Sequence, residues 1–401
     1  MMRTAELFDR TEIRAVCPLL ADGPEADPVE VLARAAWSSL TEPGDAVAAT
    51  VIDGVGAATA LAHVITTSTP ADILASIEEP PLELAALAAG LERWRPRADR
   101  ALLRRRLEIA HRLDAHLLVP GSNGWPESLD DLGPHAPLLL WVRGDASALA
   151  TPRRLALVGA RAATGYGEHV AAELAAGSAD RGVLVVSGGA FGIDAVAHRA
   201  ALGTGGRTVA FLAGGADRLY PTAHSDLLHR IIATPGSAVV TEVPPGTTPT
   251  RWRFLQRNRL IAASAAATVV VEAGARSGSL NTAGHAAALG RPLGTVPGPV
   301  TSASSAGCHR LLREYAATCV TSAADVLELL GVGEQTSEGS EPSGPATRIM
   351  DALRGRGAHD TDFIARAAGC SVADALAMLG ALLADGFVER GEDGGWRTAP
   401  R

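Results

Sequence analysis

The chain has 401 residues and a formal net charge of −8; 47% of its residues are hydrophobic and 20% are charged. At roughly 100–200 residues per domain this length predicts two or three globular domains, and the apolar fraction excludes a wholly disordered chain. All 36 basic residues are arginine, which excludes the lysine chemistry of P-loops, Schiff bases and pyridoxal enzymes.

The cysteines and the N-terminus indicate the cellular compartment. Four cysteines (Cys17, Cys308, Cys319 and Cys370) lie far apart without a CxxC pair, so we expect neither a zinc ribbon nor a disulfide framework. The first residues are charged rather than typical of a signal peptide, and no apolar run reaches the roughly 18 residues of a membrane span. We expect a cytoplasmic protein without a membrane partner, a metal or a cofactor.

Residues 1–115 are rich in Ala and Leu and predict a helical domain. Apolar residues recur at helical spacing in Val29–Leu40, Pro70–Glu78 and Leu82–Arg95. Asp53–Gly56 resembles the turn of a helix-hairpin-helix unit, which can bind a DNA phosphate, although a plain interhelical turn is the preferred interpretation. The arginine-rich segment Arg93–Arg112 predicts a solvated helix face. The acidic net charge does not indicate nucleic-acid binding, but a local basic site can persist in an acidic protein.

Residues 116–331 predict an extended Rossmann-like domain of the α/β class, with a doubly wound parallel sheet. Short β-branched segments alternate with Ala-rich helical ones, which is typical of parallel strands covered on both faces. Ligands of such sheets bind beyond the carboxyl ends of the strands. The predicted strands are Leu155–Val158, Val183–Val186, Thr208–Leu212, Ala238–Thr241, Thr268–Val271 and Leu293–Val296.

Residues 332–344 are rich in Gly, Ser and Glu and predict a linker. Residues 345–401 then predict three helices and a β-hairpin, the pattern of a small winged-helix domain. Its third helix, Ser371–Leu383, contains no arginine. We therefore expect this domain to contact protein or to support the structure rather than to read a DNA major groove.

Two loops of the central domain have the composition of anion-binding turns. Val158–Gly167 follows a strand, opens a helix and places Arg161 at the strand end, although a surface ion pair would also explain this arginine. Ser187–Asp194 contains three glycines that let a backbone approach a ligand closely. Asp194 is either a ligand contact or an ordinary N-cap, and His198 is expected to be structural.

Two later segments also predict anion binding. Arg251–Arg259 has four arginines, two aromatics and no acid, which suits phosphate contacts and base stacking; the alternative is a helix whose arginines pair with other loops. Ser277–Ser279 opens another helix after a strand. No nucleophile–base pair or metal-binding motif occurs in these loops, so we expect binding rather than catalysis.

In this order, the segments VGARAATGYG, SGGAFGIDAVAH, FLAGGADRLYP, RWRFLQRNRLIAA, VVVEAGARSGSLNTAGHAAALGR and TVPGPV resemble the DNA-processing protein A (DprA/Smf) family. The resemblance implies a non-enzymatic protein that binds single-stranded DNA, protects incoming strands, dimerises and loads the RecA recombinase during natural transformation. The DNA-binding positions implied are Gly159, Ala160, Arg161, Ser187, Gly188, Gly189, Ala190, Gly192, Phe254, Arg257, Asn258, Arg259, Ser277, Gly278 and Ser279.

Departures from the family pattern leave two alternatives open. The usual Phe-Pro before the Arg-Asn-Arg signature is Phe254-Leu255-Gln256 here, and His309 stands where an Asn is common. One alternative is a nucleotide-processing hydrolase of the lysine-decarboxylase-like fold, although the PGGxGTxxE pattern is missing. The other is a protein-binding adaptor that works through its winged helix.

Overall fold

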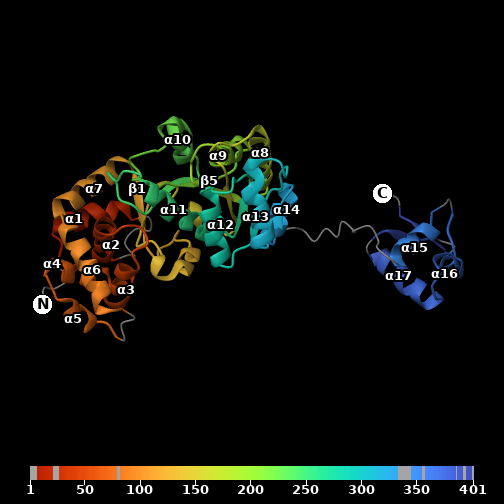
Figure 1. The fold of residues 1–401 in the computed structure, drawn as a ribbon, viewed down its shortest axis with the longest axis horizontal. Helices are drawn as coiled ribbons and strands as arrows, with labels where there is room; N and C mark the ends of the chain where they lie inside the picture. The colour runs from red at the N-terminus through yellow and green to blue at the C-terminus, as the bar shows by residue number, and fades with distance from the viewer. Residues whose placement is uncertain are drawn as a thin grey trace. The chain divides into compact units, whose positions relative to one another are not determined.

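A computed structural model describes residues 7–20, 27–78, 82–332, 345–354, 357–384, 386–391 and 394–399. They belong to two compact units, Met1–Val332 and Gly333–Arg401, drawn in Figure 1. The first unit contains both the predicted helical domain and the predicted sheet domain. The unit boundary follows Val332, and the rest of the predicted linker lies outside the described residues.

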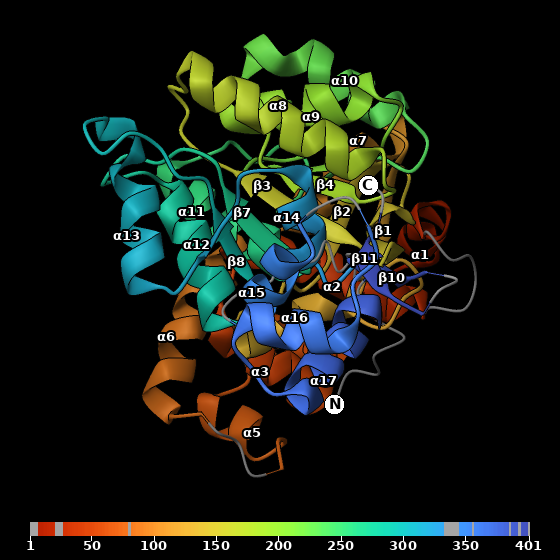
Figure 2. The ribbon, with the colours of Figure 1, turned by 90° about the vertical axis from the view of Figure 1, so that its right-hand side faces the viewer.

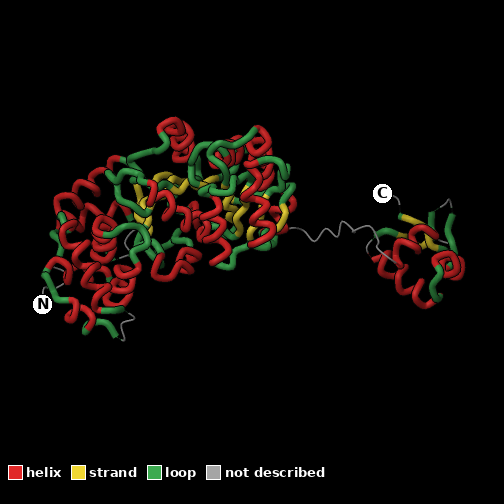
Figure 3. Tube along the Cα trace, viewed as in Figure 1, coloured by secondary structure: helices red, strands yellow, loops and turns green. Residues whose placement is uncertain are grey.

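The chain up to the first strand is helical, as predicted (Figure 3). Acidic N-caps define several of its helices: the side chains of Asp27, Asp45 and Asp99 each accept a hydrogen bond from the first turn that follows. The helices are α1 (Arg10–Val16), α2 (Pro28–Leu40), α3 (Ala46–Val55), α4 (Ala57–Ile65), α5 (Pro70–Leu74), α6 (Leu84–Trp94) and α7 (Arg100–Arg112).

The glycine turn between α3 and α4 is a plain interhelical turn. Gly56 has a φ of 82°, which favours glycine. The Glu30 carboxylate of α2 accepts hydrogen bonds from the N–H groups of Ala57 (2.7 Å) and Ala58 (3.1 Å). Since an internal carboxylate already occupies these donors, they cannot bind a DNA phosphate as a helix-hairpin-helix turn does.

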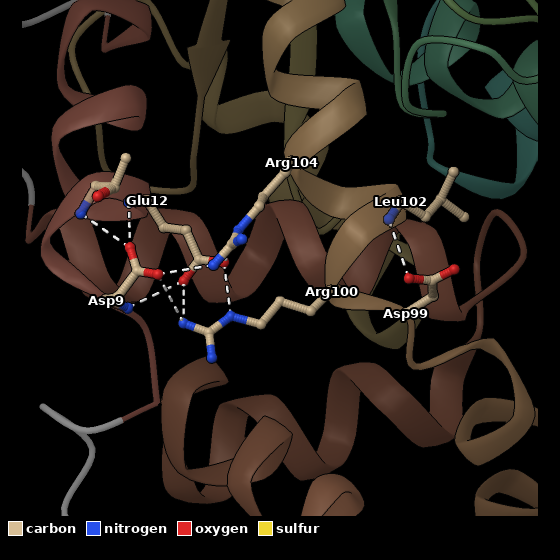
Figure 4. A network of polar contacts seen from close by, with 7 residues as sticks. Asp9, Glu12, Asp99, Arg100, Leu102 and Arg104 are labelled. Atoms are coloured by element: carbon tan, nitrogen blue, oxygen red, sulfur yellow. Dashed lines mark hydrogen bonds and ion pairs between the residues drawn. The ribbon is translucent and has the colours of Figure 1, made fainter.

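Part of the arginine-rich helix α7 is paired rather than solvated (Figure 4). The buried Glu12 carboxylate accepts hydrogen bonds from Arg100 Nε (2.6 Å) and Arg104 Nε (2.8 Å), and Arg104 Nη2 also reaches Asp9 at 2.7 Å. Burial by itself raises the pKa of Glu12, but the hydrogen bonds from Arg100, the Asp9 backbone and Arg104 outweigh it and lower the pKa to about 2. These ion pairs tie α7 to α1.

The sheet has nine strands among the described residues, in the order β1-β2-β6-β5-β4-β3-β7-β8-β9. The pairs β1–β2 and β2–β6 are antiparallel and all others are parallel. All six predicted strands are present, whereas the two antiparallel strands and β9 were not predicted. The bounds are β1 (Ala115–Leu118), β2 (Leu140–Gly144), β3 (Arg154–Val158), β4 (Leu184–Ser187), β5 (Thr208–Phe211), β6 (Ala238–Thr241), β7 (Ala267–Val270), β8 (Leu293–Thr295) and β9 (Thr318–Cys319).

Helices cover both faces of the sheet, which explains why its central strands are uninterruptedly apolar. Figure 2 shows α8 (Gly165–Ala179), α9 (Ile193–Gly203) and α10 (Ser225–Ala233) on one side. One hydrophobic core joins α8 and α9 with α14 (Ala323–Leu329). A separate core on the other face includes residues of the remaining helices, α11 (Arg251–Ser264), α12 (Ser279–Ala288) and α13 (Ala306–Glu314).

The helical part packs directly on the antiparallel end of the sheet. Its core, which contains Trp37 and Trp94, also includes Leu117 of β1 and Trp141 of β2. The N–H of Trp37 donates to the Ala57 carbonyl at 3.1 Å, and that of Trp94 donates to Asp45 at 3.0 Å. The two predicted domains therefore share one core, which explains why they form one compact unit.

The second unit has the predicted three helices and hairpin: α15 (Pro345–Ala352), α16 (Thr361–Ala368), α17 (Val372–Ala384), β10 (Val388–Arg390) and β11 (Trp396–Thr398). Ser371 precedes α17 and its Oγ accepts a hydrogen bond from the Asp374 N–H at 3.1 Å, as an N-cap does. In the described residues no single helix is long and apolar enough to cross a bilayer; two bent pairs, α3–α4 and α16–α17, meet that test only when each pair is combined.

Candidate functional site

A candidate site lies where the strand order reverses. After β3 the chain adds β4, β5 and β6 on one side, and then returns to place β7 on the other side of β3. The loops that leave β3 and β7 diverge there, and such a switch point opens a ligand crevice at the carboxyl edge.

This crevice is a cavity of about 810 Å³, which we call the switch pocket. Its lining consists of Val158, Gly159, Ala160, Arg161, Ala162, Ala190, Asp194, Tyr220, Pro249, Thr250, Arg251, Phe254, Leu255, Arg257, Asn258, Ile261, Gly274, Arg276, Ser277, Gly278, Ser279 and Thr282.

The loop after β3 is held rigidly and presents Arg161. The Ala160 N–H donates to the Glu272 carbonyl at 2.7 Å. The buried Glu272 carboxylate accepts hydrogen bonds from the N–H and the hydroxyl of Thr164, both at 2.8 Å, and Thr164 in turn caps α8. Arg161 is exposed, and the N–H groups of Arg161 and Ala162 find no acceptor in the described part of the chain. This loop can therefore bind an anion through one cation and two N–H groups.

The loop after β7 faces it with a similar set of donors. Its turn is closed by the Ser277 N–H, which donates to the Gly274 carbonyl at 3.0 Å, and by a 2.7 Å contact between the hydroxyls of Ser277 and Ser279. Arg276 is exposed, and no described residue accepts a hydrogen bond from the Gly278 N–H. Because α12 begins at Ser279, its positive N-terminal end also faces the switch pocket.

The glycine-rich loop after β4 is organised internally instead. The buried Asp194 carboxylate accepts hydrogen bonds from the N–H groups of Gly188 (3.2 Å) and Ala190 (3.4 Å). Gly192 has a φ of 72° and lies directly against the Ala160 carbonyl. Asp194 is thus not a simple N-cap, because its Oδ2 holds the glycine-rich loop through two backbone N–H groups. Ser187 donates to the Leu157 carbonyl at 2.7 Å and is fully buried.

Arg257 ties this loop to α11. It is 5% exposed, and its Nη1 donates to the carbonyls of Gly188 and Phe211. Burial lowers the pKa of Arg257 to about 10, Asp194 acts in the opposite direction, and Arg161 lowers it further. Arg257 therefore remains a cation at neutral pH and contributes positive potential to the pocket wall, although its hydrogen bonds serve the protein itself.

The other residues of the Arg-Asn-Arg signature are also held by internal contacts. Arg259 forms two 2.6 Å hydrogen bonds with the Glu242 carboxylate and a 2.9 Å hydrogen bond with the His135 carbonyl. Arg259 is 3% exposed and is not part of the pocket lining. Asn258 Nδ2 donates to the Gly278 carbonyl at 3.3 Å, which fixes the loop after β7. Two of the four arginines of Arg251–Arg259 are therefore buried and bonded to other segments.

An aromatic wall completes the switch pocket. The Phe254 ring centroid lies 5.8 Å from that of Tyr220, and the Arg161 Cζ lies 4.9 Å from the same Phe254 centroid. Tyr220 is 48% exposed. Flat aromatic and guanidinium surfaces next to anion donors can accept an unpaired base beside its phosphate.

The structure gathers ten of the fifteen predicted positions in the pocket lining: Gly159, Ala160, Arg161, Ala190, Phe254, Arg257, Asn258, Ser277, Gly278 and Ser279. The others, Ser187, Gly188, Gly189, Gly192 and Arg259, lie outside the lining.

Twelve lining residues were not among the predicted positions, and they include two arginines and a tyrosine. Arg251 and Arg276 stand beside the recognised motifs, and their charge was the available signal. Tyr220 follows β5 in a loop whose position next to Phe254 depends on the fold.

The switch pocket lacks an evident catalytic arrangement in its described residues. His198 is fully buried outside the lining, where its Nδ1 contacts the Thr208 hydroxyl at 2.7 Å, and burial lowers its pKa to about 3. The only lining carboxylate, Asp194, is occupied by backbone N–H groups. Among the described residues, no three metal-ligating side chains form a cluster.

Comparisons with known proteins agree with this architecture. A family model for DNA recombination-mediator protein A matches residues 116–331. The chain is 49% identical over 310 residues to a putative DNA processing protein DprA of Mycobacterium tuberculosis, covering 73% of this chain and 79% of that protein. It is 31% identical over 262 residues to DNA processing protein DprA of Bacillus subtilis, covering 64% and 84%.

A solved structure supports the same assignment. DNA processing protein A of Streptococcus pneumoniae superposes with a TM-score of 0.57 at 30% identity, covering 74% of this chain and 95% of that one. The family model alone spans more than half of the chain and includes every loop of the switch pocket. The chain therefore belongs to the DNA recombination-mediator protein A family.

Proposed function

We propose that this protein binds single-stranded DNA in the switch pocket as a recombination mediator. The observation that carries the proposal is the concentration of unused donors at one sheet edge. Arg161, Arg251 and Arg276 are exposed there, and the N–H groups of Arg161, Ala162 and Gly278 find no acceptor among the described residues. Such a set suits phosphate oxygens.

The aromatic wall favours an unpaired strand over a duplex. Tyr220 and Phe254 both line the pocket. A base can stack on either ring only if its face is not already covered by the stacked neighbours of a duplex. Phosphate contacts alone would bind either form. We therefore expect a preference for single strands that depends on the aromatic residues.

The finer parts of the proposal follow from the family. DNA processing proteins of this family are expected to protect incoming strands, act as homodimers and load the RecA recombinase during natural transformation, in the cytoplasm. We extend these roles to this chain as hypotheses. We further propose that it works by binding and not by catalysis, since the described pocket residues offer no paired nucleophile and base.

The test is fluorescence anisotropy with a labelled oligonucleotide of about 30 nucleotides, single-stranded or as duplex, across a salt series. We expect tighter binding of the single strand. Arg161→Ala should weaken this binding roughly tenfold, the effect of losing about 1.4 kcal/mol, and should make the salt slope shallower by about 0.7 for the lost phosphate contact.

Arg181→Ala is the matched control, because Arg181 is exposed and precedes β4 at the opposite edge of the sheet. It should leave both affinity and salt slope unchanged. Equal, weak binding of single strand and duplex, or equal losses in the two variants, would contradict the proposal. Hydrolysis of a nucleoside monophosphate would instead support the enzymatic alternative.

A further inference from the structure

The first turn of α11 places three consecutive residues in three different surroundings. Successive helical residues are about 100° apart around the axis, so Arg251, Phe254 and Leu255 share the face that lines the switch pocket. Arg253, about 200° from Arg251, points to the helical part of the unit. Trp252 lies between these two faces and is 57% exposed. It borders the pocket face without belonging to the lining.

On the far side of Trp252, two arginines share one carboxylate. Arg253 Nε and Nη2 each donate to Glu42 at 3.0 Å, and Arg97 Nη1 lies 3.5 Å from the same carboxylate. Glu42 belongs to the loop between α2 and α3, and Arg97 precedes α7. One carboxylate therefore pairs with two guanidinium groups, so this group of three side chains keeps a net positive charge.

A third arginine adds to this excess. Arg106 of α7 has two buried nitrogens, Nε and Nη1, without a hydrogen-bond partner in the described structure. Burial lowers the pKa of Arg106, and the nearby charge of Arg253 lowers it further, while Asp99 acts in the opposite direction. The Asp99 carboxylate caps its own helix through the Leu102 N–H at 3.0 Å. An anion beside the half-buried Arg106 guanidinium would offset the positive charge that Arg97, Arg106 and Arg253 share.

We propose that a strand in the switch pocket continues across Trp252, which stacks a base, to a second phosphate site formed by Arg97, Arg106 and Arg253. This extension rests on the proposed function and assigns the helical part of the unit a direct role in binding DNA. The aromatic ring and the arginine cluster supply the two kinds of contact that single-strand tracks use. The site should matter only for strands long enough to leave the pocket.

The experiment compares an oligothymidine of about 6 nucleotides, a length that fits within one binding module, with one of about 30 nucleotides. Arg106→Gln should leave the affinity for the short strand unchanged. It should weaken binding of the long strand roughly threefold to tenfold and make its salt slope shallower by about 0.7. Arg106→Lys should restore part of the salt slope, because it keeps the charge.

Arg112→Gln is the control for charge alone, since Arg112 is exposed in the last turn of the same helix. It should affect neither strand. Thermal unfolding of each variant checks that the fold persists. If Arg106→Gln unfolds the protein, Trp252→Ala replaces it as the test, with the same expected selectivity for the long strand.

Trp252 also supplies a direct spectroscopic signal. It is the exposed tryptophan of the chain, since the other five are at most 6% exposed. The long strand should quench the intrinsic fluorescence more strongly than the short one, and Trp252→Phe should abolish the difference while retaining the affinity.

Three results would overturn the inference. If Arg106→Gln and Trp252→Ala both leave the long strand unaffected while Arg161→Ala weakens both strands, the second phosphate site is wrong and the proposed pocket function stands. If the wild-type protein binds neither strand, both the proposed function and the second phosphate site are wrong. If Trp252→Ala changes the sedimentation mass without changing DNA affinity, Trp252 contacts protein instead.

Discussion

The buried arginines of α11 and the exposed arginines at the rim of the switch pocket lie in neighbouring segments but have different roles. Arg257 and Arg259 are buried and bonded to carbonyls and to Glu242. Arg161 and Arg276 are exposed instead, beside N–H groups for which no described residue provides an acceptor. The arginines of the Arg-Asn-Arg signature, Arg257 and Arg259, therefore stabilise the structure of the site. The arginines that are free to bind stand in the surrounding loops, as Arg161 and Arg276 do, or at the start of α11, as Arg251 does.

Removing an arginine that holds the site together should lower the free energy of unfolding the most. Arg259→Ala leaves the Glu242 carboxylate, which is 9% exposed, without its two charged hydrogen bonds. We expect the free energy of unfolding to fall by about 3–5 kcal/mol, the usual cost of breaking a buried pair. Equilibrium urea unfolding measures this loss. Arg161→Ala should change the free energy of unfolding by less than about 0.5 kcal/mol. Comparable losses in the two variants would contradict the distinction between structural and binding arginines.

The loop after β4 tests the same distinction through an acid. Asp194→Ala removes the acceptor of two backbone N–H groups and the negative charge near buried Arg257. We expect a loss of about 2–3 kcal/mol, because the buried donors lose their partner. Asp194→Asn keeps an acceptor oxygen and should lose less. An unchanged urea midpoint in Asp194→Ala would show that the loop does not depend on this carboxylate.

The ion pairs of Glu12 with Arg100 and Arg104 make the contribution of structural arginines measurable through its pH dependence. The pKa of Glu12 is lowered from 4.5 to about 2 in the folded state, so its stabilisation is present above pH 4.5 and is lost as the pH falls towards 2. Glu12→Gln should cost about 1–2 kcal/mol at pH 7, less than the full shift implies because Arg100 and Arg104 are half-exposed. The difference from the wild type should shrink as the pH falls through about 2 and vanish below it. A pH-independent difference in urea unfolding would contradict this electrostatic origin.

The parallel strands were predictable because burial on both faces selects short apolar β-branched segments such as Leu155–Val158. The antiparallel strands β1 and β2 were missed, since they lie outside the strand–helix alternation that guided the prediction. The sharing of one core between the helical part and β2 was also missed. It depends on Trp141 contacting helices that are distant in sequence, and local periodicity carries no such information.

The switch pocket was predictable in position but less so in the roles of its residues. The rule that ligands bind beyond the carboxyl ends of parallel strands located Arg161 and Ser277–Gly278 correctly within one cavity. The composition of two other segments, Ser187–Asp194 and Arg251–Arg259, grouped Gly188 and Arg259 with them. Whether an N–H group or a guanidinium is free depends on acceptors elsewhere in the chain, here Asp194 and Glu242.

The sequence by itself determined the fold class and the edge of the sheet where function should be sought, because strand burial and glycine-rich loops are encoded locally. The tertiary structure alone decided which donors are already used. Arg251 and Arg253 are two residues apart, yet one lines the switch pocket and the other binds Glu42 of the helical part. Charge is a property of a residue, whereas its availability depends on the partners that the fold brings within hydrogen-bonding distance.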